Sequence, residues 1–153
     1  MNLLSIITKP TSEKLETLLK LSKKSCLKNP NAYNVCQLSK IQQDVTQNKH
    51  TEKEFSGELY YENRPGIYRC IVCKTPLFSS KSKFTSKCGW PSFCDVINID
   101  NFHFVKDTTY GMIRVEVVCN KCYSHLGHVF DDGPKPTGLR YCINSASLEF
   151  QFD

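Results

Sequence analysis

Two pairs of cysteines constrain the fold of this chain more strongly than any other feature of its sequence. Each pair has two intervening residues: Cys70 with Cys73, and Cys119 with Cys122. This spacing lets both sulfurs of one turn reach the same ion, and two such turns complete the tetrahedral four-thiolate shell of a structural zinc site. Because 45 residues separate the pairs, more than in a simple zinc ribbon, we expect the ion to join two hairpins that lie far apart in the sequence.

Two other interpretations of these cysteines remain open: two disulfides, or one pair acting as a redox motif. A redox pair of this spacing is typical of the start of a helix after a strand, whereas both pairs here lie beside strand-like runs. The chain has nine cysteines, an odd number, which disfavours a scaffold built only from disulfides. We therefore predict one structural Zn²⁺ per chain, with no catalytic role because protein sulfurs fill all four positions.

The excess of positive charge lies entirely in the first third of the chain. Residues 1–50 contain eight lysines and three acidic residues, which account for the whole net charge of +5. Residues 51–153 contain twelve basic and twelve acidic residues, so their charges cancel. A nucleic-acid-binding domain carries a basic surface on its folded body, and no apolar run reaches the roughly 18 residues of a membrane helix. We expect neither a nucleic-acid partner nor a membrane.

The N-terminus lacks the features of an export or transit signal. The apolar segment at residues 3–7 is cut short by Lys9 and Pro10, below the roughly 7–15 residues of a secretory signal core. A transit peptide is rich in arginine and poor in acids, but the first arginine is Arg64, and Glu13 and Glu16 precede it. We expect a cytoplasmic location, with organellar targeting as the alternative.

A change in composition near residue 50 separates a helical part from a β-rich part. All seven glycines and sixteen of the seventeen aromatic residues lie beyond it. Before it, apolar residues at helical spacing predict two short helices, one from Glu13 to Lys24 and one from Leu38 to Val45, with a loop at 28–34 between them. Beyond it, alternating patterns predict a mainly β fold with antiparallel sheets. The expected strands lie at 113–117 and 147–152, with further candidates at 68–72, 102–105 and 125–130.

Among the five remaining cysteines, Cys142 has the sequence context of a reactive thiol. Arg140 lies two residues before it, and a nearby cation lowers the pKa of a thiol from its usual value of about 8.5. His125 and His128 add two imidazoles that can orient or protonate a substrate oxygen. Less specific interpretations stand beside this one: a buried cysteine acting as a small apolar residue, and histidines acting as further metal ligands. The spacing leaves open whether the histidines meet Cys142.

The segment at residues 88–92 (CGWPS) is the other unusual stretch. Gly89 permits a backbone conformation closed to other residues, and Pro91 stiffens the loop. The only tryptophan, Trp90, lies between them, where it either forms an aromatic wall for a methyl group or packs in the core beside a turn. Composition does not choose between these two interpretations.

Several motifs, taken in order, resemble the B-type methionine sulfoxide reductases. They are the two cysteine pairs, VTQNKHTEKEFSG at 45–57, CGWPSF at 88–93, HLGHVF at 125–130 and DGPKPTGLRYCINSASL at 132–148. No single motif is specific, but together they are. The resemblance extends from about Leu38 to Phe152, roughly three-quarters of the chain.

The resemblance implies a reaction and a role for each residue of the site. The substrate would be methionine R-sulfoxide, free or in proteins, with Cys142 as the attacking thiolate and Cys88 as the resolving thiol. A dithiol such as thioredoxin would reopen the resulting disulfide. The substrate would be surrounded by His125, His128 and Asn144 at the sulfoxide oxygen, Trp90 at the methyl group, and Arg140 and Phe130 in the same pocket, while Cys70, Cys73, Cys119 and Cys122 would bind structural zinc.

The resemblance also implies an architecture. Two twisted antiparallel sheets, in a tent-like or barrel-like arrangement, would carry short helices on their outside. The reductase domain would span residues 38–153, and residues 1–37 would form an N-terminal helical extension, so Cys26 and Cys36 inherit no role. We expect Cys94 to have no role in the reaction. We also expect the chain to act as a monomer.

Two other functions compete with the reductase. The first is a binding module: related β folds with the same four-cysteine zinc site bind partner proteins or small ligands. Such a module does not need Cys142, Cys88 or the histidines at 125 and 128. A nucleic-acid-binding zinc ribbon is disfavoured by the neutral charge of residues 51–153 and by the wide gap between the cysteine pairs.

Overall fold

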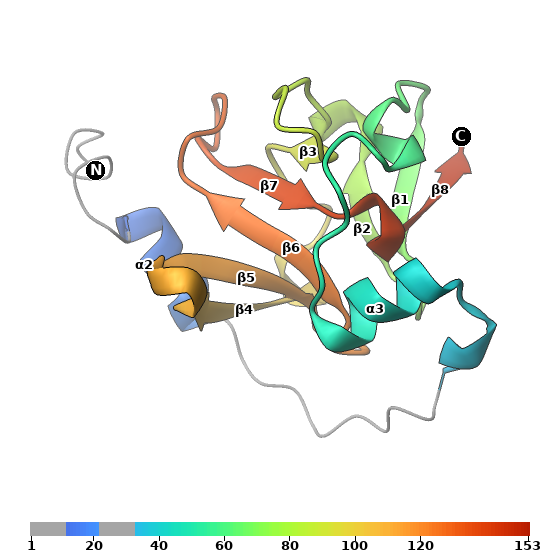
Figure 1. Cartoon of the computed structure of the whole chain (residues 1–153). Helices are drawn as coiled ribbons and strands as arrows, with labels where there is room; N and C mark the ends of the chain where they lie inside the picture. The colour runs from blue at the N-terminus through green and yellow to red at the C-terminus, as the bar shows by residue number, and fades with distance from the viewer. Residues whose placement is uncertain (1–11, 22–32) are drawn as a thin grey trace.

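Two open antiparallel β-sheets form the body of the protein in the computed structural model, which describes residues 12–21 and 33–153 (Figure 1). The larger sheet has the strand order β3-β7-β6-β5-β4, and the smaller has the order β2-β1-β8. The prediction of a mainly β fold with two antiparallel sheets is confirmed, and neither sheet closes into a barrel within the described ranges. The strands are β1 (Gly66–Cys70), β2 (Pro76–Ser79), β3 (Ser92–Phe93), β4 (Phe102–Asp107), β5 (Arg114–Cys119), β6 (His125–Phe130), β7 (Arg140–Ile143) and β8 (Leu148–Phe152).

The helical spacing predicts two α-helices before the sheets, and both are present; residues 22–24 of the first predicted helix lie outside the described residues. The first, α2 (Glu13–Leu21), lies against β4 and places Leu15 and Leu18 in the hydrophobic core (Figure 1). The second, α3 (Lys40–Asn48), begins with a capping box at Ser39 and packs against β6. Six short 3₁₀ helices complete the described elements: η2 (Val35–Gln37), η3 (Glu58–Tyr60), η4 (Ser80–Ser82), η5 (Ile99–Asn101), η6 (Thr109–Gly111) and η7 (Ser145–Ser147). Cys26 and most of the loop predicted at 28–34 lie outside the described residues.

The apolar core lies between the two sheets. The ring of Phe78 on β2 stacks on that of Phe93 on β3, with centroids 4.2 Å apart, and Tyr68 on β1 meets Phe93 edge-on at 5.0 Å. Tyr141 and Ile143 of β7 are buried in the same core. Side chains alternate along a strand, so Cys142, which lies between Tyr141 and Ile143, faces the opposite side of the larger sheet.

The strand β5 departs from the alternation that its sequence predicts. Every residue from Val115 to Cys119 is buried, including Glu116, which is only 4% exposed. Ile113, which the pattern assigns to the apolar face, lies outside the strand and is 47% exposed. Glu116, on the polar face of β5, is therefore covered by other residues, and these residues belong to the candidate site. Within residues 12–21 and 33–153, no helix combines the length and apolar character needed to cross a bilayer.

Gly127 on β6 marks a close approach between β6 and β7. A Cβ atom at this position would overlap the backbone oxygen of Cys142 and lie 3.0 Å from the Cα of Ile143. Since these are backbone atoms of the neighbouring strand, the sheet itself would have to shift. We predict that Gly127→Ala lowers the free energy of unfolding by about 1–3 kcal/mol, the usual range for overpacking.

Urea denaturation followed by circular dichroism measures this change. Gly111→Asn is the matched control, because nothing lies within 4 Å of a Cβ at Gly111 and asparagine tolerates its positive φ of 70°. Equal stability of Gly127→Ala and the wild type would contradict the close approach.

Candidate active site and metal site

The two cysteine pairs form turns of the same construction. In each turn the residue after the second cysteine, Lys74 or Tyr123, has a left-handed backbone, with φ of 65° and 62°. Its N–H donates to the carbonyl of the first cysteine, at 2.8 Å in both turns. The hydroxyls of Thr75 and Ser124 lie 3.0 and 3.1 Å from the sulfur of the second cysteine of their own turn. The sequence thus builds the same sulfur-presenting turn twice.

The four sulfurs of these turns meet in one cluster. The Sγ atoms of Cys70 and Cys122 are 3.6 Å apart, those of Cys73 and Cys119 are 3.5 Å apart, and all four lie within 4.8 Å of one another. A tetrahedral shell with Zn–S bonds of about 2.3 Å has sulfur–sulfur edges of about 3.8 Å, so the cluster can hold a metal ion. Cys70 ends β1 and Cys119 ends β5, so the cluster joins the smaller sheet to the larger.

The second group of predicted residues lies on the outer face of the larger sheet. Cys142 on β7 pairs with Ser92 on β3 and with His128 on β6, and His128 pairs in turn with Glu116 on β5. Residues that pair across antiparallel strands have side chains on the same face. Hydrogen-bond register therefore places Cys142 and His128 side by side, which sequence spacing leaves open.

A bulge brings His125 onto this face as well. Residues three apart on a regular strand face opposite sides, but the register shifts between Val117 and Val118, so that Val118 pairs with His125 and Leu126 is skipped. The rings of His125 and His128 consequently lie 5.7 Å apart. Leu126, the skipped residue, is fully buried in the core.

Cys88 lies next to Cys142, with 3.7 Å between their sulfurs. The loop that carries Cys88 depends on Gly89, whose φ of 95° is unfavourable for other residues and whose carbonyl accepts a hydrogen bond from the N–H of Phe55. The hydroxyl of Ser86 lies 2.9 Å from the Cys88 sulfur and holds it in place. Two thiols at this separation need only a small movement to form a disulfide.

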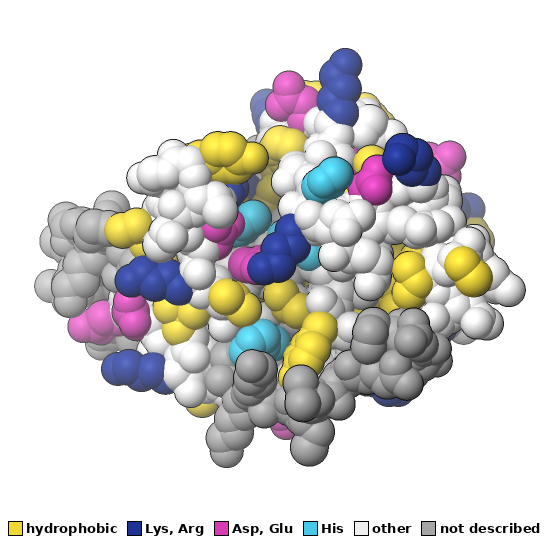
Figure 2. Space-filling model, turned by 60° about the horizontal axis from the view of Figure 1, so that its bottom comes forward, with side chains coloured by type: hydrophobic (Ala, Val, Ile, Leu, Met, Phe, Trp, Pro, Cys, Tyr) yellow, Lys and Arg dark blue, Asp and Glu magenta, His cyan; other side chains and the backbone are white. Residues whose placement is uncertain are grey.

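A cavity of about 100 Å³ opens beside Cys142. A larger groove of about 650 Å³ shares Thr51, Arg114 and His128 with it, so the two hollows lie next to each other. Figure 2 shows histidine, acidic and basic side chains gathered near the centre of one face of the molecule. The cavity is lined by Thr51, Trp90, Arg114, Gly127, His128, Phe130, Cys142 and Asn144, whereas His125 lines only the groove, and Cys88 and Arg140 line neither.

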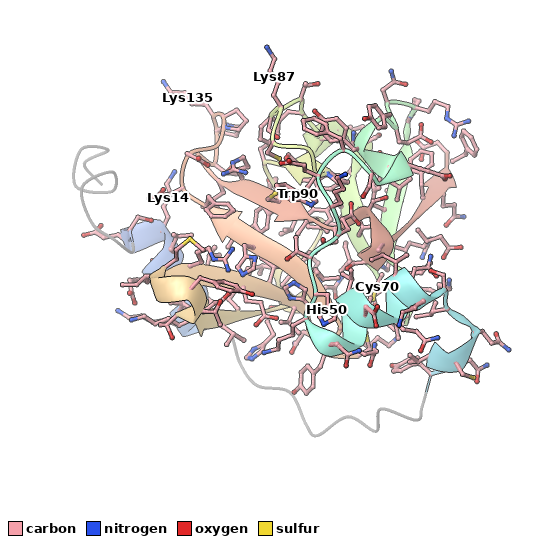
Figure 3. All side chains as sticks on the ribbon, viewed as in Figure 1. Lys14, His50, Cys70, Lys87, Trp90 and Lys135 are labelled. Atoms are coloured by element: carbon pink, nitrogen blue, oxygen red, sulfur yellow. The ribbon has the colours of Figure 1, made fainter. Side chains whose placement is uncertain are left out.

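The segment that follows α3 fixes Trp90 and Asn144. The Trp90 indole N–H donates to the carbonyl of Glu52 at 3.0 Å, and the N–H of Glu52 donates to the Asn144 side-chain oxygen at 2.9 Å. The Asn144 amide also donates to the carbonyl of Leu126 at 3.0 Å. In Figure 3 Trp90 lies beside this segment, so the tryptophan is a wall of the cavity rather than part of the core.

Each of the two histidines of the site, His125 and His128, is held by a carboxylate. Nδ1 of His125 lies 2.7 Å from Glu116, and Nε2 of His128 lies 2.7 Å from Asp107. Although burial alone raises the pKa of Glu116, the hydrogen bond from His125 and the charge of Lys49 lower it below its usual value. Burial and the nearby charge of Arg114 lower the pKa of His128 below its usual value, and Asp107 only partly opposes them. At neutral pH His128 is therefore mainly the neutral imidazole.

The two thiols of the site share one proton. The hydrogen bond from Cys142 lowers the pKa of Cys88 to about 4, against the effect of burial. The same hydrogen bond and burial raise the pKa of Cys142, and the nearby charge of Arg140 only partly opposes them. The resting pair thus carries one negative charge, with the proton on Cys142. The charge effect of Arg140 that the sequence predicts is present but is outweighed by the second thiol.

Arg140 lies beside the thiols with its guanidinium held in place. It donates to Asp132 at 2.8 Å and covers the ring of Phe130, with 4.4 Å from the guanidinium carbon to the ring centroid. A cation over an aromatic face is stabilised by the ring quadrupole. Phe130, paired with Arg140 across β6 and β7, therefore orients the arginine as well as lining the cavity.

Four polar residues of the site carry no prediction from the sequence. Glu52 lies within a motif but received no role, and Arg114 and Glu116 follow an alternation typical of a solvent-facing surface. Asp107 is an acidic residue at the end of a strand, which is common in any β protein. For the other three, the only sequence signal is a charged residue within or at the end of an apolar strand, which is weak without a partner. The four residues are Glu52, Asp107, Arg114 and Glu116.

Comparison with known proteins gives consistent matches. The family model described as the SelR domain matches residues 38–152. The chain is 59% identical over 107 residues to the peptide methionine sulfoxide reductase MsrB of Herminiimonas arsenicoxydans, covering 70% of this chain and 78% of that protein. It is 51% identical over 113 residues to the protein of the same name from Escherichia coli O139:H28, covering 74% of this chain and 82% of that protein.

A mouse protein is also similar. The chain is 58% identical over 113 residues to the mitochondrial methionine-R-sulfoxide reductase B3 of Mus musculus. That match covers 74% of this chain but 45% of the mouse protein, so the chain spans less than half the length of that relative. With the family model matched over most of its length and the bacterial relatives covered over more than two-thirds of theirs, the chain belongs to the SelR domain family, the B-type methionine sulfoxide reductases.

Proposed function

We propose that this protein reduces methionine R-sulfoxide to methionine, with Cys142 as the nucleophile and Cys88 as the resolving thiol. The observation that carries the proposal is the 3.7 Å separation of the Cys88 and Cys142 sulfurs beside a cavity lined by Trp90, His128 and Asn144. The names of the bacterial and mouse relatives support the same reaction. A binding module with the same metal cluster has no need of this arrangement.

The reaction follows from the sulfur chemistry of the pair. The sulfur of Cys142 attacks the sulfoxide sulfur, the oxygen passes to Cys142 with a proton, and methionine leaves, so that Cys142 becomes a sulfenic acid. Cys88 then attacks the Cys142 sulfur, water leaves, and a disulfide forms. An external dithiol of the thioredoxin type reopens this disulfide by exchange and returns both thiols.

The walls of the cavity suit a sulfoxide. The flat face of Trp90 packs against the methyl group, and Phe130 closes the apolar side. Asn144 has two amide protons, one of which is used on the carbonyl of Leu126, so the other is left to donate to the sulfoxide oxygen. His125 and His128 assist the transfer of the proton to the sulfoxide oxygen in the first step, and the positive charge of Arg140 stabilises the attacking sulfur. We also propose that the chain acts as a monomer.

The remaining parts of the proposal concern the metal and the location. We propose one structural Zn²⁺ on Cys70, Cys73, Cys119 and Cys122, because their sulfur separations fit a tetrahedral shell. The ion would supply four metal–thiolate bonds between the two sheets. The domain boundaries, 1–37 and 38–153, and the cytoplasmic location stay predictions, and a mitochondrial address appears in the name of the mouse relative.

We predict that Cys142→Ser abolishes reduction of the R sulfoxide of a blocked methionine, because a serine hydroxyl is not a nucleophile toward sulfoxide sulfur. Turnover with dithiothreitol should fall at least about 10³-fold, and the S sulfoxide should not react with either protein. Chromatographic measurement of the methionine product on resolved sulfoxides tests this. Cys36→Ser, a change at an exposed cysteine away from the site, is the control and should keep full activity. Turnover by a folded Cys142→Ser protein would remove Cys142 from its role.

We predict that Cys88→Ser completes one turnover but fails to cycle with thioredoxin. The sulfenic acid still forms on Cys142, but no neighbouring thiol condenses with it. A burst of one methionine per chain, followed by at least about tenfold slower turnover, is the expected time course. Cys94→Ser is the matched control and should cycle normally. Normal cycling of Cys88→Ser would pass the resolving role to another thiol.

We predict that Cys119→Ser loses the bound zinc and with it the native fold. Removal of one ligand leaves three sulfurs and a cavity in the joint between the sheets, and structural zinc binding is part of the folding free energy. Metal analysis should fall from one zinc per chain to about none, with loss of the cooperative thermal transition. Treatment of the wild type with a strong chelator should produce the same loss. A folded, active and metal-free Cys119→Ser protein would refute the metal site.

A further inference from the structure

Asp107 at the end of β4 gathers the polar groups behind the candidate nucleophile. One carboxylate oxygen lies 2.7 Å from Nε2 of His128 and 3.3 Å from Nη2 of Arg114. The other accepts hydrogen bonds from the backbone N–H of Thr109 at 3.0 Å and from its hydroxyl at 2.7 Å. The side chain of Asp107 is only 15% exposed. Donors on η6 and β5 therefore fix the carboxylate before it meets the imidazole.

The contact with Asp107 decides which nitrogen of His128 is left to accept a proton. A carboxylate accepts hydrogen bonds, so Nε2 carries the proton that it receives. In the neutral imidazole Nδ1 is then an acceptor. His128 lines the same cavity as Cys142 and lies directly opposite it across β6 and β7. The nitrogen that remains for the cavity is thus the basic one.

We propose that Asp107 is a positioning residue, which holds the Nε2–H tautomer of His128 so that Nδ1 accepts the thiol proton of Cys142 as the sulfur attacks. This inference rests on the proposed function and assigns a role to a residue that no motif indicates. The arrangement is a nucleophile, a base and a carboxylate that orients the base, in the order Cys142, His128, Asp107.

The proton and electron balance of the step is complete. The Cys142 S–H bond breaks and its proton moves to Nδ1, giving an imidazolium that the Asp107 carboxylate stabilises. The sulfur of Cys142 then gains the oxygen, the sulfoxide S–O bond breaks, and the imidazolium returns the proton to that oxygen. Cys142 is oxidised by two electrons to the sulfenic acid, and the sulfoxide is reduced by two electrons to the sulfide.

The charges around the site agree with these roles. Burial tends to raise the pKa of Asp107, but the hydrogen bonds from Thr109 and His128 hold it well below its usual range, so the carboxylate is ionised. Burial lowers the pKa of His128, which leaves it neutral and able to accept a proton. The groups that share the surroundings of His128 are Asp107 from β4, Arg114 and Glu116 from β5, His125 from β6, Arg140 and Cys142 from β7, and Lys49 and His50 at the end of α3.

Cys88 is the competing acceptor, because it shares a proton with Cys142 in the resting protein. The test therefore uses the Cys88→Ser background, in which the first half-reaction occurs alone. Single-turnover reduction of the R sulfoxide of a blocked methionine is followed by rapid quench between pH 5 and 9. The substrate dissociation constant is measured in parallel from the fluorescence of Trp90, the only tryptophan.

Asp107→Asn should lower the single-turnover rate by roughly 10²-fold or more, the usual contribution of a general base, with the substrate dissociation constant unchanged. The hydrogen bond to Asp107 raises the pKa of His128. A weaker hydrogen bond in Asp107→Asn should lower the pKa of His128. The acid limb of the rate–pH profile should therefore move to lower pH, while the plateau rate falls. In ¹⁵N spectra the proton of neutral His128 should move from Nε2 toward Nδ1.

His128→Gln should lose a similar factor, and the Asp107→Asn, His128→Gln double variant should be no slower than His128→Gln alone, because Asp107 acts through His128. Asp100→Asn is the control: it removes an exposed carboxylate just before the same strand, and it should leave the rate and the pH profile unchanged. Multiplied losses in the double variant, or an unchanged rate in Asp107→Asn, would overturn the inference. A wild type that reduces neither sulfoxide would instead overturn the proposed function.

Discussion

The register between β6 and β7 is the constraint on which the rest of the site depends. It places Cys142 opposite His128 on one face of the sheet, while Tyr141 and Ile143 enter the core on the other. A shift of one residue would exchange these faces, burying the thiol and exposing an aromatic ring. The apolar core therefore fixes the orientation of Cys142, the proposed nucleophile, and Gly127 allows the two strands to approach closely enough for that pairing.

The four-cysteine cluster and the thiol pair place six cysteines in two separate groups. The four clustered sulfurs lie where β1 and β5 end, and they connect the smaller sheet to the larger. Cys88 and Cys142 lie on the outer face of the larger sheet, where solvent and substrate have access to the cavity. The cluster that joins the sheets and the partly buried thiol pair are therefore separate groups of cysteines.

Buried carboxylates organise the polar face of the larger sheet. Glu116 on β5 and Asp107 on β4 each hold one histidine, and the main chain at Glu52 holds Trp90 and Asn144. A buried polar group is costly unless it is paired, so these contacts define one orientation for each ring and amide. The cavity is consequently preorganised, and the two imidazoles differ in the nitrogen that each leaves unbound.

The sequence by itself determined the local features of this protein. The spacing within each cysteine pair, the two amphipathic helices and the period of the strands depend on neighbouring residues, and the family motifs predicted Cys142 and Cys88 as the reactive thiols. Only the tertiary structure decided the contacts across strands. It placed Asp107 and Glu116 next to the two histidines, and a bulge turned His125 to the same face as His128. It also brought together the thiols of Cys88 and Cys142, which lie far apart in the sequence. These contacts depend on register, which is set by core packing over the whole sheet and not by the spacing of residues along any one strand.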